Sequence, residues 1–361
     1  MAKVLVGMSG GVDSSVCAHL LQKQGYDVAG ATLKLFDNKD IGLDEKAPCS
    51  SDNDVRDAKS VAEKLGCEHY VFEYKDDFKE HVIKNFTQCY VDGMTPNPCV
   101  QCNKNIKFGK MLDEAKKLGF DYIATGHYAR IDRDEETGRW LLKKGADPTK
   151  DQSYVLYVLT QEELSKTIFP LGDMPKTEIR EIAEHEGLVT ARKKDSQDIC
   201  FIKDGDYAGF LQNVMGVKTE QGDFLDTEGN KIGTHKGIIH YTVGQRKGLG
   251  QTFGKPVYVL DKDKKTNSVT LGSNEDLFAD GMIVADVNLI SVENISEPLR
   301  VTAKARYSMK ETCATIYPPK DGVYTVEFDE KQRAITPGQA AVFYHGDVVV
   351  GGGTIVKAVY K

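Results

Sequence analysis

The chain has 361 residues, 40% of them hydrophobic and 28% charged, which is the composition of an ordinary globular protein too long for one hydrophobic core. Its formal net charge of −7 argues against a generic polyanion binder but allows local basic surfaces. No apolar run is long enough to span a bilayer and nothing suggests secretion. We therefore expect a cytoplasmic protein without a membrane partner, whose eight cysteines are thiols, catalytic groups or ligands rather than disulfides.

The first 25 residues predict a loop that binds phosphate. Residues 4–6 have the composition of a short buried strand, and apolar residues from Val16 onward fall at helical spacing. Between them lies the glycine- and serine-rich stretch Gly7–Ser15. Such a turn points backbone N–H groups and the positive end of the helix at one spot, and Gly10 and Gly11 have no Cβ to keep an anion away. The pattern is neither a Walker A loop nor a dinucleotide fingerprint, and the remaining alternative is a turn that binds nothing.

Strands and helices alternate through the first 125 residues. Strands are expected at 28–33, 69–74 and 121–125, and helices at 54–66 and 104–118. This alternation is typical of a mostly parallel sheet with helices on both faces, in which ligands bind beyond the carboxyl ends of the strands. Two further residues at that edge are expected beside the adenine or ribose of a nucleotide, namely Leu33 and Gly126.

The second half of the chain has a different character. A hairpin is expected at 130–144 and helices at 151–159 and 176–186, but short strands separated by glycine and asparagine dominate after about residue 205. We therefore predict three domains: an α/β domain with the phosphate loop over 1–205, a small central β-rich domain over 206–281 and a C-terminal β-barrel over 282–361.

A second chemical centre is predicted around Cys99 and Cys102. This Cys-x-x-Cys pair follows two prolines and stands just before the helix expected from Lys104, whose positive end would lower the pKa of a thiol. Cys102 is therefore a candidate nucleophile, and Cys200 is a third candidate almost a hundred residues on. Three alternatives are a zinc site, a thioredoxin-like redox pair, and an iron–sulfur cluster held by Cys99, Cys102 and Cys200. The other cysteines are expected to pack or lie at the surface: Cys17, Cys49, Cys67, Cys89 and Cys313.

These segments resemble the bacterial tRNA-specific 2-thiouridylases, a family within the PP-loop ATP pyrophosphatase superfamily. The matching motifs occur in the same order over essentially the whole chain: Ser-Gly-Gly-x-Asp-Ser from Ser9, Asn-Pro-x-x-x-Cys-Asn-Lys from Asn97, Ala-Thr-Gly-His-Tyr from Ala124, Lys-Asp-Gln-Ser-Tyr from Lys150, Ser-Gln-Asp-Ile-Cys-Phe from Ser196, Gly-Gln-Arg-Lys-Gly-Leu-Gly from Gly244 and Ala-Arg-Tyr from Ala305. The resemblance implies ATP- and Mg²⁺-dependent thiolation at C2 of the wobble uridine in tRNAs for Lys, Glu and Gln, with release of AMP and pyrophosphate.

The resemblance also implies roles for individual residues. Cys200 would carry a persulfide supplied by a cysteine desulfurase or a sulfur-carrier protein, and Cys102 would attack it or assist sulfur release, leaving a Cys102–Cys200 disulfide to be reduced. Some relatives have Asp, proposed as a general acid or base, where this chain has Cys99, which leaves Cys99 as an assisting thiol or a ligand. The ATP site would comprise Gly7, Met8, Ser9, Gly10, Gly11, Val12, Asp13, Ser14, Leu33 and Gly126. The target base and the tRNA would contact Asn97, Pro98, Cys99, His127, Lys150, Asp151, Gln152, Arg306, Tyr307 and Gln339.

Two other functions use part of this sequence. Another PP-loop enzyme, an amidotransferase-type synthetase that adenylates an oxygen for attack by nitrogen, would have no use for Cys102 and Cys200. A cysteine-ligated redox or iron–sulfur sensor that binds RNA would have no use for the ATP loop. ATP consumption that depends on both tRNA and a sulfur source would separate the three functions.

Overall fold

The computed structural model describes residues 1–42, 51–193, 198–202 and 205–361, and the chain divides into two compact units. The first unit comprises Met1–Ile83, Cys99–Gly205 and Asp347–Val349, and the second comprises Lys84–Pro98, Asp206–Gly346 and Val350–Lys361. Residues 43–50, which include Cys49, and residues 196–197 of the Cys200 motif lie outside the described residues. Among the helices that are described, none is both long and apolar enough to cross a membrane.

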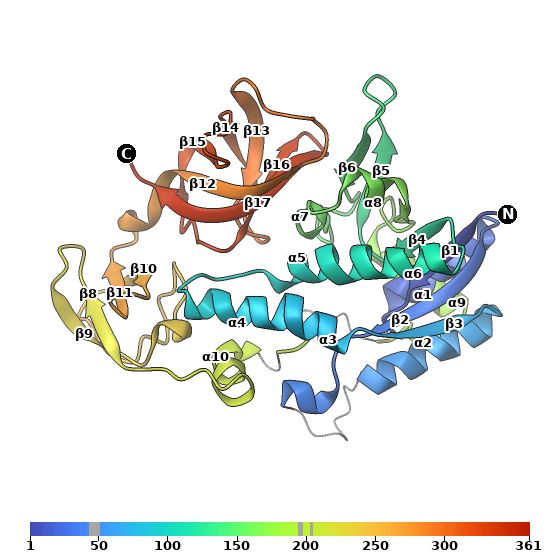
Figure 1. The fold of residues 1–361 in the computed structure, drawn as a ribbon, viewed down its shortest axis with the longest axis horizontal. Helices are drawn as coiled ribbons and strands as arrows, with labels where there is room; N and C mark the ends of the chain where they lie inside the picture. The colour runs from blue at the N-terminus through green and yellow to red at the C-terminus, as the bar shows by residue number, and fades with distance from the viewer. Residues whose placement is uncertain (43–50, 194–197, 203–204) are drawn as a thin grey trace. The chain divides into compact units, whose positions relative to one another are not determined.

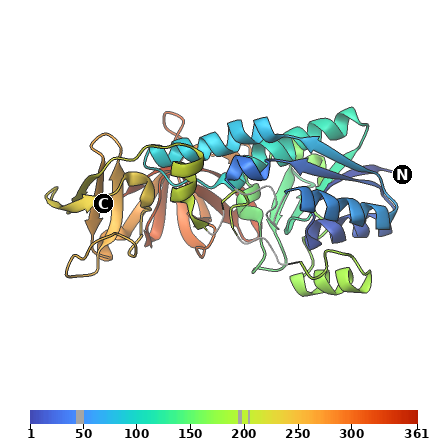
Figure 2. The same cartoon turned by 90° about the horizontal axis from the view of Figure 1, so that it is seen from below.

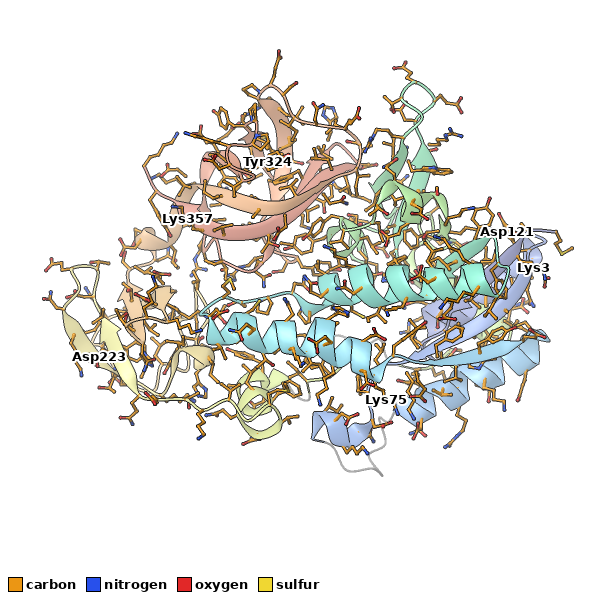
Figure 3. The ribbon with its side chains drawn as sticks, in the orientation of Figure 1. Lys3, Lys75, Asp121, Asp223, Tyr324 and Lys357 are labelled. Atoms are coloured by element: carbon orange, nitrogen blue, oxygen red, sulfur yellow. The ribbon has the colours of Figure 1, made fainter. Side chains whose placement is uncertain are left out.

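The first unit is built on a five-stranded parallel sheet with the strand order β3-β2-β1-β4-β7 (Figure 1). Its strands are β1 (Lys3–Gly7), β2 (Asp27–Lys34), β3 (His69–Glu73), β4 (Tyr122–Thr125) and β7 (Thr167–Ile168). At the amino-terminal edge the main-chain N–H of Lys3 donates to Oδ2 of Asp121 at 2.8 Å, and Figure 3 shows the two residues beside each other. The opposite edge, where the strands end, is the one that binds ligands in such sheets. The predicted parallel sheet is confirmed.

Helices cover both faces of this sheet, so residues 4–6 of its central strand β1 are apolar and buried. Helices α1 (Val12–Lys23), α2 (Ser51–Leu65) and α9 (Lys176–His185) share one buried core with β1 and β2. Helix α6 (Met111–Lys117) packs on the other face, where Met111 lies against Gly7. Figure 2 shows the blue helices α1 and α2 on one side of the strands and the teal helix α6 on the other.

The helix that carries the Cys-x-x-Cys pair begins earlier than predicted. Helix α5 (Pro98–Cys102), the π-helical turns η3 (Asn103–Lys110) and α6 follow one another without a break, whereas the helix was expected to begin at Lys104. Proline suits the first position of a helix, because its missing N–H would have no partner there and its φ is already helical. Cys102 therefore lies inside the helix and not just before it, so that prediction is wrong. A similar run forms α3 (Lys75–Phe78), the π-helical turns η2 (Lys79–Ile83) and α4 (Lys84–Val91).

The rest of the first unit follows the prediction in outline. Strands β5 (Ala129–Arg133) and β6 (Trp140–Lys144) form the expected hairpin, and α9 is the helix expected at 176–186. Helix α7 (Ser153–Leu156) is shorter than the predicted 151–159, because the side chain of Asp151 accepts the N–H of Ser153 at 3.0 Å and so starts the helix there. A separate helix, α8 (Gln161–Ser165), begins at a capping box formed by Thr160 and Glu163.

The second unit is dominated by two β structures. The smaller is a four-stranded sheet with the order β10-β11-β8-β9, made of β8 (Gly222–Leu225), β9 (Lys231–His235), β10 (Tyr258–Asp263) and β11 (Ser268–Gly272). The larger is a barrel with the order β12-β15-β14-β13-β16-β17, closed by pairing of β12 with β17. Its strands are β12 (Phe278–Leu289), β13 (Leu299–Lys304), β14 (Thr312–Ile316), β15 (Tyr324–Arg333), β16 (Ala340–His345) and β17 (Val348–Val359). Helix α4, helix α10 (Tyr207–Gly209) and the π-helical turns η5 (Phe210–Val214) complete the unit.

The predicted fold class, an α/β domain followed by two β-rich domains of which the last is a barrel, is confirmed. The domain limits at 205 and 281 stay predictions. Among the short strands expected after residue 205, the one over 231–241 ends early, because the chain leaves the sheet after His235. Gly237, with φ of +120°, turns the chain into the 3₁₀ turn η6 (Ile238–His240).

Candidate active site

The phosphate loop lies between the end of β1 and the start of α1, as predicted. Gly10 has φ of +68°, and a Cβ built on it would come within 2.5 Å of the main-chain oxygen of Asp54, so glycine alone fits there without movement. Gly11 is the N-cap residue of α1 and has no side chain with which to cap it. The N–H groups of the first turn therefore face the loop, where an anion can accept from them.

The hydroxyl groups of Ser14 and Ser15 form hydrogen bonds with the main chain of the loop. Ser14 and Ser15 are buried, and both donate to the main-chain oxygen of Gly11, at 3.1 and 2.8 Å. Ser14 Oγ also accepts the N–H of Ser9 at 3.2 Å. The side chain of Ser9 is exposed, which leaves it the hydroxyl best placed for a bound phosphate. Two of the three predicted hydroxyl donors thus hold the shape of the loop in this structure.

Asp13 is the centre of a polar network on the first turn of α1. Its Oδ1 accepts from the Tyr128 hydroxyl at 2.7 Å and from Lys176 Nζ at 2.6 Å. Lys176 is only 8% exposed, and its ammonium also lies over the Tyr128 ring, 5.7 Å from the centroid. The place of Asp13 at the start of the helix predicts a helix cap or a metal ligand, and its side chain does not cap the helix here. The Lys176 ammonium is thus held at the first turn of α1, where the Asp13 carboxylate balances its charge.

A second lysine contacts the loop from the opposite side. Lys193 Nζ donates to the main-chain oxygen of Gly10 at 3.0 Å, to Asp54 at 2.7 Å and to Asp57 at 2.7 Å. The sequence placed Lys193 only in a basic run, and nothing local pointed to Lys176, which reaches Asp13 from 163 residues along the chain. Tyr128 was visible only as the last residue of the Ala-Thr-Gly-His-Tyr motif.

The two residues predicted to flank the nucleotide lie at the same sheet edge. Gly126 directly follows β4, and a Cβ built on it would come within 2.9 Å of the Ser14 nitrogen, so the chain passes against the first turn of α1. Leu33 is partly buried near the end of β2. Both positions fit a nucleotide that lies across the carboxyl ends of the strands.

The structure brings Cys200 together with Cys99 and Cys102. Cys102 is buried, whereas Cys99 and Cys200 are exposed. Cys99 and Cys102 lie close enough to Cys200 to raise the pKa of its thiol. Lys107 lies one turn beyond Cys102 on the same helix, and its positive charge lowers the pKa of all three thiols. All of these residues belong to the first unit, which also holds the phosphate loop.

The predicted activation of Cys102 is corrected by its surroundings. Burial raises the pKa of Cys102 to about 11, Lys107 lowers it by less, and Cys99 raises it further. The packing of protein atoms around Cys200 raises its pKa to about 12, although part of the residue is exposed, and the pKa of Cys99 is raised as well. Because Cys102 lies inside the helix and not at its free end, the helix dipole does not offset its burial. All three are therefore thiols at neutral pH.

We expect alkylation of Cys102 by iodoacetamide to be slow at neutral pH and to rise about tenfold per pH unit until the pH nears the thiol pKa. The sign follows from the raised pKa, because the reactive thiolate appears only as pH increases. Peptide mass spectrometry after timed labelling measures Cys102 separately from the other cysteines, with the exposed Cys313 as reference. Labelling of Cys102 that is fast and independent of pH from neutral upward would show that the thiol is already ionised.

The iron–sulfur and zinc alternatives stay hypotheses. Among the described residues, which include Cys99, Cys102 and Cys200, no group of three or more His, Cys, Asp or Glu side chains is arranged to hold a single metal ion.

The predicted tRNA residues of the first unit are partly engaged in internal contacts. His127 is buried between Phe108 and Phe169, with its Nδ1 at 2.6 Å from Thr125 Oγ1, and burial holds its pKa well below the usual value. Gln152 Oε1 accepts the N–H of Tyr128 at 3.0 Å. Asp151 accepts from Gly145 and Ser153, and Lys150 is half-buried beside it. His127, Asp151 and Gln152 therefore shape this surface in the absence of RNA.

The predicted tRNA residues of the second unit show a similar division. Tyr307 is 46% exposed, with the Lys304 ammonium over its ring. Arg306 Nη2 donates to Val243 O at 2.8 Å and also to Thr336 Oγ1. Gln339 Nε2 donates to the main-chain oxygen of Thr95 at 2.7 Å, and residues 97–98 follow shortly after. Tyr307 is the member of this group whose side chain is most open to solvent.

Comparisons with known proteins cover almost the whole chain. Three family models match it: the tRNA methyl transferase HUP domain over residues 2–204, the tRNA methyl transferase PRC-barrel domain over 208–273 and the Aminomethyltransferase beta-barrel domain over 279–355. The chain is 52% identical over 356 residues to tRNA-specific 2-thiouridylase MnmA of Clostridioides difficile (strain 630), which covers 99% of this chain and 98% of that protein. It is 51% identical over 358 residues to tRNA-specific 2-thiouridylase MnmA 1 of Thermoanaerobacter pseudethanolicus, with the same coverage. Among solved structures, a 4-thiouridine synthetase–RNA complex with bound ATP aligns at a TM-score of 0.36 and 18% identity, over 55% of this chain and 44% of that one.

Proposed function

Because the chain belongs to the MnmA family of tRNA-specific 2-thiouridylases, we propose that it uses ATP to replace O2 of the wobble uridine of tRNA by sulfur. The observation that carries this proposal is that one compact unit holds both the phosphate loop and the pair Cys102 and Cys200. An amidotransferase-type synthetase needs only the loop, and a redox sensor needs only the cysteines. The proposed substrates are the tRNAs for Lys, Glu and Gln, with Mg²⁺ entering as the ATP complex.

The first proposed step is adenylation of the base. Uridine O2 attacks the α-phosphate of ATP, and the bond between the α-phosphate and the bridging oxygen to the β-phosphate breaks. The loop stabilises the negative charge that develops on the leaving pyrophosphate. The N–H groups of Gly10, Gly11 and the first turn of α1 bind the phosphates, while Lys176 and Lys193 supply positive charge from two sides. Leu33 and Gly126 line the nucleoside. The oxygen of the base then leaves as AMP, which is a far better leaving group than hydroxide.

The second proposed step is sulfur transfer. A desulfurase or carrier protein loads Cys200 as a persulfide, whose terminal sulfur attacks C2 and displaces AMP. The Cys102 thiolate then attacks the Cys200 sulfur and breaks the S–S bond, which leaves 2-thiouridine and a Cys102–Cys200 disulfide. A thiol reductant then supplies two electrons and two protons, which reduce this disulfide to the two free thiols. Because the pKa of Cys102 is raised in the substrate-free state, Lys107 and a proton acceptor are needed to form this thiolate, and Cys99 is the neighbouring thiol.

The proposed RNA contacts come from residues of each unit. The wobble base must leave the anticodon stack to reach the reacting groups, as base-modifying enzymes generally require. Asn97, Pro98 and Cys99 line the pocket for this base. Lys150 contacts phosphate and Tyr307 stacks on a base, while the other predicted contacts support them: His127, Asp151, Gln152, Arg306 and Gln339.

The decisive experiment is reconstitution with purified components. The protein is incubated with Mg·ATP, tRNA, cysteine and a cysteine desulfurase, and 2-thiouridine is measured by mass spectrometry of the digested tRNA. We expect product only when ATP, tRNA and the sulfur source are all present, with one AMP released per thiolated base. ATP cleavage that proceeds with tRNA and ammonia but without sulfur would support the synthetase alternative instead.

We expect Lys176→Met to lower kcat/KM for ATP in pyrophosphate release by about 100-fold, since it removes a buried cation beside the phosphates. The matched control is Lys23→Met. It removes an exposed lysine from the last turn of α1, where Lys23 pairs with Glu186. That variant should keep the wild-type value, because exposed ion pairs contribute about 1 kcal/mol at most. Equal values for the two variants would place Lys176 outside the ATP site.

A further inference from the structure

A buried lysine in the second unit contacts the chain just before the Cys-x-x-Cys pair. Lys262 on β10 is 8% exposed, and its ammonium donates to Tyr241 O at 2.8 Å and reaches Met94 O at 3.5 Å. It also lies over the Tyr90 ring, 5.7 Å from the centroid. An ammonium has three N–H donors. Here its neighbours are two main-chain oxygens, of Tyr241 and Met94, and the face of the Tyr90 ring.

Burying the Lys262 ammonium costs free energy, so the contacts that only a lysine can make are the reason for this side chain. Burial lowers its pKa to about 7, with Asp261 acting weakly in the opposite direction. An apolar side chain of similar length would fill the same space without this cost, but it could not bind two carbonyl oxygens. The lysine thus stabilises one particular position of the Met94 carbonyl. Gly93 packs against the same residue, because a Cβ built on it would lie 3.3 Å from Lys262 O.

The same short segment is held from a second side. The N–H of Thr95 donates to Pro337 O at 2.9 Å, and Gln339 Nε2 donates to Thr95 O at 2.7 Å. The loop approaches so closely that a Cβ on Gly338 would come within 2.9 Å of the Met94 side chain. Both main-chain groups of Thr95 are therefore bound to the loop that precedes β16, while the preceding carbonyl is bound to β10.

We propose that Lys262 and Gln339 are positioning residues that fix residues 94–98, so that Asn97 and Pro98 present the target base in the geometry the chemical step needs. The inference rests on the proposed function. It assigns to Gln339 an action through Thr95 O rather than through direct contact with tRNA. A displacement of about 1 Å at a reacting centre costs about 100-fold in rate, so a segment that carries the base pocket gains from being held at three points.

Lys262→Met tests this inference with two readouts. In single-turnover thiolation at saturating tRNA and ATP, we expect the rate to fall at least about tenfold while the KM for tRNA changes by less than about twofold. We also expect faster hydrogen exchange at the Thr95 amide, because the segment is released on one side. Lys231→Met is the matched control, since it removes an exposed lysine from β9 of the same sheet and should leave both readouts unchanged.

Gln339→Leu is the second variant, because its partly exposed side chain can be replaced without leaving a buried charge. It should reproduce both effects if Lys262→Met does not fold. Wild-type single-turnover rates in Gln339→Leu and in folded Lys262→Met would overturn the inference while leaving the proposed function intact. A loss of tRNA affinity with an unchanged chemical rate would also overturn it, and would make Gln339 an RNA contact. A wild-type protein that forms no 2-thiouridine would refute the proposed function itself.

Discussion

Cys200→Ser is expected to abolish sulfur loading and to reduce tRNA thiolation by at least about a thousandfold, because Cys200 is the thiol on which the proposed persulfide forms. Cys102→Ser should accept labelled sulfur on Cys200 and release AMP, and then stop with the tRNA joined to Cys200 through the S–S bond that Cys102 would otherwise break. The measurement is transfer of labelled sulfur from a cysteine desulfurase, followed by non-reducing electrophoresis of the protein and digestion of the tRNA. The exposed Cys313 gives the matched control, and Cys313→Ser should behave like the wild type.

Cys99→Ser separates the persulfide scheme from the cluster scheme. Under the persulfide scheme it lowers activity by less than either partner, since some relatives have Asp at this position. Under the cluster scheme it removes a ligand, bleaches visible absorption and abolishes activity as the other two substitutions do. A fully active, iron-containing Cys200→Ser protein would contradict both schemes. We favour the persulfide, because Cys102 lies close enough to Cys200 for its thiol to influence the Cys200 thiol.

Features encoded in neighbouring residues were predictable from the sequence. The apolar run at 4–6, the glycine-rich turn and the helical spacing that follows placed β1, the loop and α1 correctly. The alternation over the next hundred residues was enough for the parallel sheet. These patterns are local because each strand or helix must present its own apolar face to the core.

The errors came where distant parts of the chain determine the outcome. The pKa of Cys102 depends on how many residues pack around it, and burial outweighs the helix end that the sequence suggested. Lys176 and Lys193 reach the loop from far along the chain, so their spacing carries no signal. Three consecutive glycines, 351–353, lie within β17. A Cβ at Gly353 would come within 2.5 Å of Ala285 O on the neighbouring strand, so close strand contact requires glycine there.

The phosphate loop predicts which bond of ATP is cleaved. Products analysed by chromatography should be AMP and pyrophosphate, and Asp13→Ala or Ser9→Ala should abolish turnover while leaving the fold intact. Asp13 anchors Lys176 and Tyr128 at the first turn of α1, and Ser9 offers the exposed hydroxyl. ADP and orthophosphate as products would show that the loop is wrongly assigned.

Gly10→Ala is the sharper test of the loop, because the chain offers a matched glycine for comparison. Gly10 and Gly25 both have positive φ, at +68° and +88°, so alanine at either position costs about 1 kcal/mol or more of backbone strain. A Cβ at Gly25 meets nothing within 4 Å, whereas one at Gly10 would come within 2.5 Å of Asp54 O and must displace the loop or α2. We therefore expect Gly25→Ala to lower the melting temperature slightly and keep full activity. Gly10→Ala should lose at least about 100-fold in pyrophosphate release, since the N–H donors no longer meet the phosphates. Equal activity of the two variants would show that the backbone of this loop does not bind ATP.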